Sequence, residues 1–253
     1  MSTILMEFSP TGGTSAVMAQ LSKSFVVDSR IDLSRDDDWQ GICFGERDVC
    51  LIGMPSYGGR APAIALERLR QFAGGGARAV LVAVYGNRDF EDTLREMADT
   101  VRECGFRPVA AVAAVAEHSI LPQYGAGRPS GRDIYELRQF GQDIHQDLLD
   151  HPEKQKVGVP GNRPYRAYDG VPLKPKAKRK ACIECGLCAS KCPVNAIPLD
   201  NPSQTYSNRC ISCMRCVRIC PEKARRVNPI MRFVAGLSLA RACKKPKENK
   251  LYL

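Results

Sequence analysis

Eight cysteines lie in one short stretch of the chain, and they repeat the same spacing. The segment "CIECGLCASKCP" begins at Cys182, and "CISCMRCVRICP" begins at Cys210. In each segment two residues separate the first three cysteines, three residues precede the fourth, and proline follows it. Three thiolates at this spacing converge on one face of an iron–sulfur cubane, whereas the fourth lies too far along the chain to close it. The repeat therefore predicts two [4Fe-4S] clusters, each completed by the fourth cysteine of the other half.

This crossed arrangement predicts two ligand sets. The first set is Cys182, Cys185, Cys188 and Cys220. The second set is Cys210, Cys213, Cys216 and Cys192. The alternative is structural zinc, but zinc sites usually pair two CxxC units across a longer gap. The other four cysteines are expected to be buried or incidental thiols: Cys43, Cys50, Cys104 and Cys243.

A second group of candidate residues follows the first apolar run, in "FSPTGGTSAV". Hydroxyl groups and backbone N–H groups at the start of a helix can surround a phosphate. The alternative is an ordinary strand-to-helix turn with Thr14 as the helix N-cap. The candidate phosphate-binding residues are Ser9, Thr11, Gly12, Gly13 and Thr14.

Regular elements must position these residues, and residues 1–150 alternate apolar runs with helical patterns. Predicted strands are "TILMEF", "FVVDSRIDL", "DVCLIGM", "ARAVLVAVY" and "FRPVAAVAAVA". Predicted helices are "TSAVMAQLSKS", "APAIALERLRQF", "DFEDTLREMADTVREC" and "GRDIYELRQFGQDIHQDLL". Strands that alternate with helices predict an α/β domain, a doubly wound parallel sheet covered on both faces.

The first loop resembles a known family. Ser9-x-Thr11-Gly12-x-Thr14 matches the phosphate loop of the flavodoxins, at the right place after the first strand. The resemblance implies a five-stranded flavodoxin-like sheet of order 2-1-3-4-5, with FMN at the carboxyl ends of the strands. In that family the loops after the third and fourth strands hold the flavin ring. The matching residues are Pro55, Ser56, Tyr57, Gly58, Gly59, Tyr85, Gly86, Asn87 and Arg88.

Each of these two loops alone is more typical of an ordinary glycine-rich turn, whereas three such loops at the ends of the predicted strands together favour a flavin site. Glycines let backbone amides approach a ring, and Tyr57 offers a stacking face. Arg60 and Arg88 are candidates for positive charge near the flavin or for plain surface residues. His118 follows the fifth strand, as either a proton donor or a structural hydrogen-bonding group. The run "FAGGGARAV" precedes a strand, so it is no dinucleotide fingerprint.

The rest of the chain divides into three parts. Residues 151–180 are rich in proline, glycine and cations, which predicts a linker or strap. Residues 181–228 form the predicted two-cluster ferredoxin domain, and residues 229–253 a C-terminal helix and tail. The run "KPKAKRK" is either a solvated segment or a patch for a partner. The apolar end, Leu251 to Leu253, either docks on the body or frays.

The order of parts resembles a bacterial and archaeal family that fuses a flavodoxin-like domain to a two-[4Fe-4S] ferredoxin. Stretches that carry the resemblance are "GMPSYGGRAPAIALERL", "VYGNRDFEDTL", "EHSI" and "PGNRPYR". The family is mostly anaerobic, and its substrates are poorly assigned. The N-terminus lacks the features of a signal peptide, and no apolar run reaches the length of a membrane span, which predicts a cytoplasmic protein.

Clusters move one electron at a time, whereas flavin accepts one or two. We therefore expect intramolecular electron transfer between two [4Fe-4S] clusters and FMN, with delivery to a partner redox enzyme. The alternative is a flavin-dependent reductase of a quinone, enone or nitro compound, with a substrate pocket built from residues 118–130. The net charge of +10 raises a third reading, a nucleic-acid-binding redox sensor. It is disfavoured, because two clusters and a flavin phosphate would lower that charge to ~+4.

Overall fold

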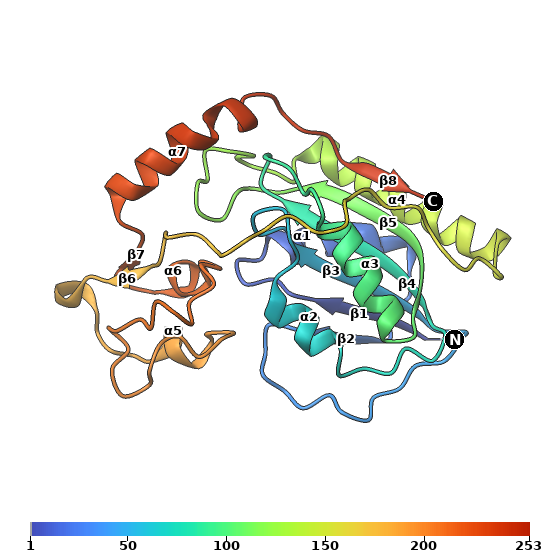
Figure 1. Ribbon diagram of the computed structural model, residues 1–253, viewed down its shortest axis with the longest axis horizontal. Coiled ribbons are helices and arrows are strands. Elements are labelled where there is room, and N and C mark those ends of the chain that lie inside the picture. The colour runs from blue at the N-terminus through green and yellow to red at the C-terminus, as the bar shows by residue number, and fades with distance from the viewer. Residues whose placement is uncertain (1) are drawn as a thin grey trace.

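The computed structural model describes residues 2–253 and shows a sheet domain beside a smaller cysteine-rich lobe (Figure 1). Five parallel strands have the order β2-β1-β3-β4-β5. They are β1 (Thr3–Glu7), β2 (Ser29–Asp32), β3 (Val49–Pro55), β4 (Arg78–Tyr85) and β5 (Arg107–Val115). This order confirms the prediction of a flavodoxin-like sheet. In such a sheet β2 lies on one side of β1, and β3, β4 and β5 follow on the other side.

A sixth strand, which the sequence did not predict, extends the sheet. Strand β8 (Lys250–Tyr252) pairs antiparallel with β5, and Leu251 lies opposite Val112. The apolar C-terminal residues therefore dock on the body, one of the two outcomes left open by the sequence. Their pairing covers the edge of β5, whose backbone groups would otherwise offer a template for another chain.

Helices cover both faces of the sheet. Helices α1 (Gly13–Leu21) and α4 (Gly131–Asp150) pack on one face, where Leu21 and Ile144 join the core. Helices α2 (Ala63–Leu69) and α3 (Thr93–Glu103) pack on the other face. Alternate strand residues supply the two cores, because successive side chains of a strand point to opposite faces.

The segment 151–180 crosses the sheet domain over α3 on its way to the cysteine-rich lobe (Figure 1). Val157 and Val159 are buried in the core beneath it. The carboxylate of Asp92 accepts hydrogen bonds from the backbone N–H groups of Asn162 and Arg166, each at 2.7 Å. Burial raises the pKa of Asp92, but these bonds outweigh burial and the net shift is downward. The strap is therefore fixed along its length.

The cysteine-rich lobe is built from short elements. They are β6 (Lys176–Ala177), a 3₁₀ turn (Arg179–Ala181), α5 (Leu187–Ser190), α6 (Arg215–Ile219) and β7 (Arg225–Arg226). Strands β6 and β7 pair antiparallel and close the lobe. Helix α7 (Pro229–Cys243) leaves the lobe and returns toward the sheet domain, and β8 follows it (Figure 1). Within residues 2–253, no helix is both long and apolar enough to cross a bilayer.

Candidate functional site

The structure gathers the eight repeated cysteines into two pockets. One pocket is lined by Cys182, Cys185, Cys188 and Cys220. The other is lined by Cys192, Cys210, Cys213 and Cys216. These are the two crossed sets that the spacing predicts, so each half of the repeat lends its fourth cysteine to the other pocket.

Backbone conformation repeats with the cysteines. Helix α6 begins 28 residues after α5, the same offset that separates Cys210 from Cys182. Left-handed residues occur at matching positions of the two halves. The matching pairs are Glu184 with Ser212, Gly186 with Met214, and Asn195 with Lys223. Because left-handed backbone is costly for residues with a side chain, its repetition indicates that both halves fold around equivalent centres.

The fourth cysteine of each half receives a hydrogen bond. The N–H of Ala196 donates to Sγ of Cys192 at 3.2 Å, and the N–H of Ala224 donates to Sγ of Cys220 at 3.3 Å. Such bonds to cysteine sulfur are a recognised means of tuning iron–sulfur clusters. Four cysteines line each pocket, which is the number of ligands that a [4Fe-4S] cluster needs. The residues present therefore fit this group.

The arrangement of the cysteines bears on whether each pocket would hold a single metal ion or a larger cluster. Across residues 2–253, no three His, Cys, Asp or Glu side chains meet closely enough to hold one metal ion. The four cysteines of a cubane bind different iron atoms and so surround a volume.

Buried arginine fixes the lobe to the sheet domain. The guanidinium of Arg68, on α2, donates to the carbonyl oxygen of Leu33 and to that of Pro193, each at 2.8 Å. Arg215 on α6 reaches the carbonyl oxygen of Pro10 at 3.3 Å, beside the candidate phosphate loop. The second cysteine pocket is thus held against the carboxyl ends of the strands.

A cavity of about 690 Å³ lies at those carboxyl ends. From the candidate phosphate loop, Ser9, Thr11, Gly13 and Thr14 line it. Gly12 does not line it; it sits at the N-cap of α1 with a φ of 90°. Ser9 Oγ accepts a hydrogen bond from the N–H of Ser15 at 2.9 Å, which closes the loop. The loop therefore presents hydroxyl groups to the cavity at a helix N-terminus.

The two candidate ring loops also face this cavity, with two exceptions. Lining residues from them are Pro55, Ser56, Tyr57, Gly58, Tyr85, Gly86 and Arg88. Gly59 lies behind the wall, where its carbonyl oxygen accepts from the N–H of Asp92. The side-chain oxygen of Asn87 accepts a hydrogen bond from the N–H of Lys247 in the C-terminal segment, at 2.8 Å.

The two candidate arginines differ in position. Arg88 lines the cavity and forms an ion pair with Glu91 at 2.7 Å. Arg60 lies outside the cavity wall and binds the carboxylate of Glu96 through two bonds, at 2.9 and 2.6 Å. Of these two arginines, Arg88 is the one that can place positive charge beside a cavity ligand.

His118 lies on the cavity wall directly against Gly86, where an added Cβ would fall 2.6 Å from the imidazole side chain. Its Nδ1 accepts hydrogen bonds from the N–H groups of Ile120 at 3.2 Å and Leu121 at 3.3 Å. Burial, helped by the charge of Arg88, lowers the pKa of His118 to about 4. The neutral ring therefore carries its proton on Nε2. His118 has a structural role through Nδ1 and keeps a donor for a ligand.

Several cavity residues come from segments that the sequence did not assign to the site. Arg166, Tyr168 and Leu173 come from the strap, and Tyr168 packs so closely on Gly58 that an added Cβ would fall 2.3 Å from its ring. Helix α7 contributes Ile230, Met231, Val234, Ala235, Ser238 and Leu239. The apolar spacing of α7 was visible in the sequence, but nothing in it showed that the helix returns over the strand ends.

One loop belongs to both kinds of site. Ile211 and Ser212 stand between Cys210 and Cys213 and line the large cavity. Ile211 also lines the second cysteine pocket. The pocket of Cys192, Cys210, Cys213 and Cys216 therefore shares a wall with the cavity, whereas the Cys182 pocket has no lining residue in common with it.

Comparison with known proteins agrees with the cysteine pockets. Residues 181–225 match the family model described as "4Fe-4S dicluster domain". A segment of 63 residues is 41% identical to the "Putative electron transport protein YccM" of Escherichia coli strain K12. This match covers 23% of the present chain and 17% of the length of that protein.

Solved structures resemble the sheet domain weakly. Rubredoxin oxygen:oxidoreductase from Desulfovibrio gigas aligns with a TM-score of 0.42 and 12% identity, over 59% of this chain and 36% of that chain. A flavodoxin from the domain Archaea aligns with a TM-score of 0.38 and 14% identity, over 59% of this chain and 99% of that chain. The flavodoxin-like assignment rests on the strand order of the sheet.

Fold and cysteine pockets together define the class of this protein. It joins a flavodoxin-like domain to a 4Fe-4S dicluster segment at residues 181–225. The prediction of such a fusion is confirmed.

Proposed function

We propose that this chain transfers electrons between two [4Fe-4S] clusters and FMN and delivers them to a partner redox enzyme. The observation that carries the proposal is the position of Ile211, which lines both the second cysteine pocket and the large cavity. Electron carriers on the two sides of one loop are close enough to exchange electrons directly. Bound there, the clusters would supply one-electron transfer, and FMN would supply both one- and two-electron transfer.

The chain's residues have separate tasks in this proposal. The two cysteine sets hold the clusters, and the bonds from Ala196 and Ala224 orient one thiolate in each. The hydroxyl-rich loop at the start of α1 binds the FMN phosphate. The loops at Pro55–Gly58 and Tyr85–Arg88 hold the ring, and Tyr168 and α7 exclude water from it.

The two cysteine pockets differ in their relation to the cavity, and this difference suggests the direction of electron flow. The Cys182 pocket lies farther from the cavity, so it is the entry point for electrons from a donor protein. Exposed cations at Lys178, Arg179 and Lys180 precede it directly. A donor with an acidic surface would be attracted to this end of the lobe.

Matched cysteine variants test the route. One variant has Cys185→Ser in the Cys182 pocket, here called distal, and the other has Cys213→Ser in the second cysteine pocket, here called proximal. Each variant is mixed rapidly with a low-potential protein donor, and the reduction of clusters and flavin is followed by absorption. With Cys213→Ser, we expect the distal cluster to bleach while flavin stays oxidised. With Cys185→Ser, dithionite should still reduce the proximal cluster and the flavin. Unchanged flavin reduction by the donor in Cys213→Ser protein, with its distal cluster spectrum intact, would contradict the proposal.

One observation favours a second candidate, a flavin-dependent reductase of a small acceptor. The cavity has an apolar lining that includes Met231, Val234 and Leu239 from α7 and Ile120 and Leu121 from the segment after β5. Flat apolar acceptors such as quinones suit such walls. Sustained turnover of a quinone or nitro compound without a partner protein would favour this candidate, and its absence would favour the carrier.

A further inference from the structure

Helix α7 has two different faces. One face lines the large cavity through Met231, Val234, Ala235, Ser238 and Leu239. Phe233 and Leu237 lie outside the cavity wall and are 67% and 62% exposed. They are four residues apart and so lie on one stripe of the helix, while Ile230, which is 73% exposed, stands at the cavity rim at the start of α7. Figure 1 shows α7 along the outer edge of the molecule.

Cations accompany this apolar stripe. From residue 223 to residue 247 the chain contains eight lysines and arginines and no aspartate or glutamate. On and after α7 these are Arg232, Arg241, Lys244, Lys245 and Lys247, and all except the half-buried Lys247 are exposed. Arg241 and Lys244 follow Leu237 at helical spacing, so apolar and cationic side chains occupy neighbouring parts of one face. This region complements an anionic surface.

We propose that the outer face of α7 lies on an anionic lipid bilayer and docks the protein at a membrane surface. The exposed side chains of Phe233 and Leu237 can enter the headgroup boundary of a bilayer, while the neighbouring lysines and arginines bind anionic lipids. We favour a bilayer over a protein partner, because exposed apolar side chains beside cations match an anionic headgroup layer without a complementary groove. The inference goes beyond electron transfer and does not depend on the cofactors.

Docking in this way has a geometric consequence. The inner face of the same helix lines the large cavity, so membrane contact places that cavity next to the lipid. Phe233 and Leu237 would enter the headgroup region, while Met231 and Val234 remain over the cavity. The Cys182 pocket belongs to the lobe from which α7 departs, and the surface of that lobe stays available to a donor.

Vesicle binding tests the proposal on the full chain purified anaerobically with its iron and flavin. Sedimentation with phosphatidylcholine vesicles is compared with sedimentation with vesicles that also contain phosphatidylglycerol. We expect binding only to the anionic vesicles, with loss at high salt. The double variant Phe233→Asn/Leu237→Asn should reduce binding at least about tenfold. Arg241→Glu/Lys244→Glu should reduce it by a similar or larger factor, since each cation near the surface contributes about fivefold.

Matched controls lie in the cysteine-rich lobe. Leu199→Asn removes an apolar side chain that is 70% exposed, and Arg179→Glu/Lys180→Glu reverses two exposed cations. Neither change should alter vesicle binding by more than about twofold. Cluster absorption of each variant shows that the lobe remains folded.

A spectroscopic readout identifies the inserted face. The chain's one tryptophan, Trp39, is only 6% exposed, so its emission should not respond to lipid. Phe233→Trp should therefore show a shift to shorter wavelength when anionic vesicles are added. No binding of the wild-type protein to anionic vesicles at low salt would overturn the proposal and leave the face to an acidic protein partner. Binding that is unaffected by Phe233→Asn/Leu237→Asn would also overturn it.

Discussion

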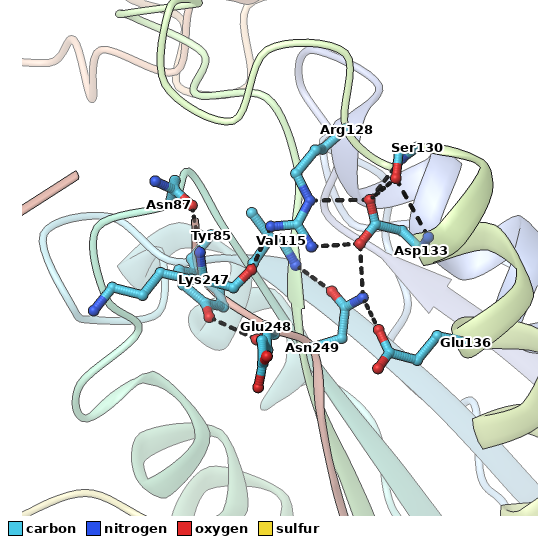
Figure 2. A network of polar contacts seen from close by, with 10 residues as sticks. All are labelled: Tyr85, Asn87, Val115, Arg128, Ser130, Asp133, Glu136, Lys247, Glu248 and Asn249. Carbon is cyan, nitrogen blue, oxygen red and sulfur yellow. Dashed lines mark hydrogen bonds and ion pairs between the residues drawn. The ribbon is translucent and has the colours of Figure 1, made fainter. Parts of the chain in front are cut away.

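Asn87 and Lys247 lie 160 positions apart, and the N–H of Lys247 donates a 2.8 Å hydrogen bond to the side-chain oxygen of Asn87 (Figure 2). The side-chain nitrogen of Asn87 donates in turn to the carbonyl oxygens of Cys243 at 2.9 Å and Lys245 at 3.2 Å. One amide thus joins the loop after β4 to the segment between α7 and β8. It fixes the end of the helix that roofs the cavity.

Loss of this amide should release the C-terminal segment. Asn87→Ala leaves one N–H and two carbonyl groups without their partner, at a cost of about 2–4 kcal/mol in the free energy of unfolding. We expect faster proteolysis near residues 244–247 and a lower urea midpoint. Asn162→Ala, which removes a side-chain bond to Asp92 at 3.1 Å elsewhere on the domain, is the control and should not increase cleavage there. Equal cleavage rates in wild-type and Asn87→Ala protein would contradict this role.

A second anchor of the C-terminal segment is ionic (Figure 2). The side-chain nitrogen of Asn249 donates to the carboxylate of Asp133 at 3.0 Å, and Arg128 pairs with the same carboxylate. Burial raises the pKa of Asp133, but the bonds from Arg128, Ser130 and Asn249 outweigh burial and lower it.

The sign of this shift predicts a pH dependence. The folded pKa of Asp133 is below the unfolded value of 3.8, so the stabilisation is present above pH 3.8 and is lost as pH falls below it. Asp133→Asn should lower the free energy of unfolding by about 2 kcal/mol at neutral pH. The difference from wild type, measured by urea unfolding, should shrink as pH falls below about 4. A difference that stays constant across this range would contradict the account.

His118 predicts a loss of stability in the same direction, on acidification, but over a higher range of pH. Its pKa is about 4 in the folded chain and 6.5 in the unfolded chain, so folding favours the neutral ring. The difference in the free energy of unfolding between wild type and His118→Gln should therefore be largest above pH 6.5 and decrease as pH falls toward 4. The full loss amounts to about 3 kcal/mol. Urea unfolding from pH 7 to pH 4.5 measures the difference, and parallel curves for the two proteins would contradict the assignment.

The contact between Gly58 and Tyr168 should control the shape of the large cavity, where we propose that FMN binds. Gly58→Ala places a methyl group against the Tyr168 ring at a φ of 61°, and we expect a loss of about 2–4 kcal/mol in stability with weaker FMN binding. Gly127→Ala isolates the strain, because Gly127 has a φ of 70° with nothing within 4 Å of an added Cβ. That control should cost about 1 kcal/mol and leave FMN affinity unchanged. Equal effects of the two changes on FMN affinity would refute the role of the contact.

The sequence predicted features that depend on local pattern. The cysteine spacing predicted which four cysteines line each pocket, because three closely spaced cysteines converge and the fourth lies too far along the chain to join them. Apolar periodicity located the strands, and their order was implied by the resemblance of the loop at Ser9 to the flavodoxin phosphate loop. Both inferences needed only short-range information.

Features that depend on distant contacts were not predicted. Nothing near Leu251 indicates that it pairs with Val112, since a three-residue strand carries almost no pattern. Tyr168 lay in a proline-rich segment that we interpreted as a linker, and its place over Gly58 follows from the bonds that Asp92 makes to the strap. We assigned Asn87 to the flavin-ring loop because of its neighbours in sequence, but its side chain hydrogen-bonds to the backbone of the C-terminal segment instead.

The central claim is that one chain holds iron–sulfur clusters and flavin in electronic contact. An anaerobic reductive titration, followed by absorption on protein assayed for iron and released flavin, tests it most directly. The account predicts about eight irons and one FMN per chain, with both chromophores bleached by a low-potential donor. Iron without flavin, in protein that cannot bind added FMN, would contradict it and reduce the flavodoxin-like domain to a scaffold.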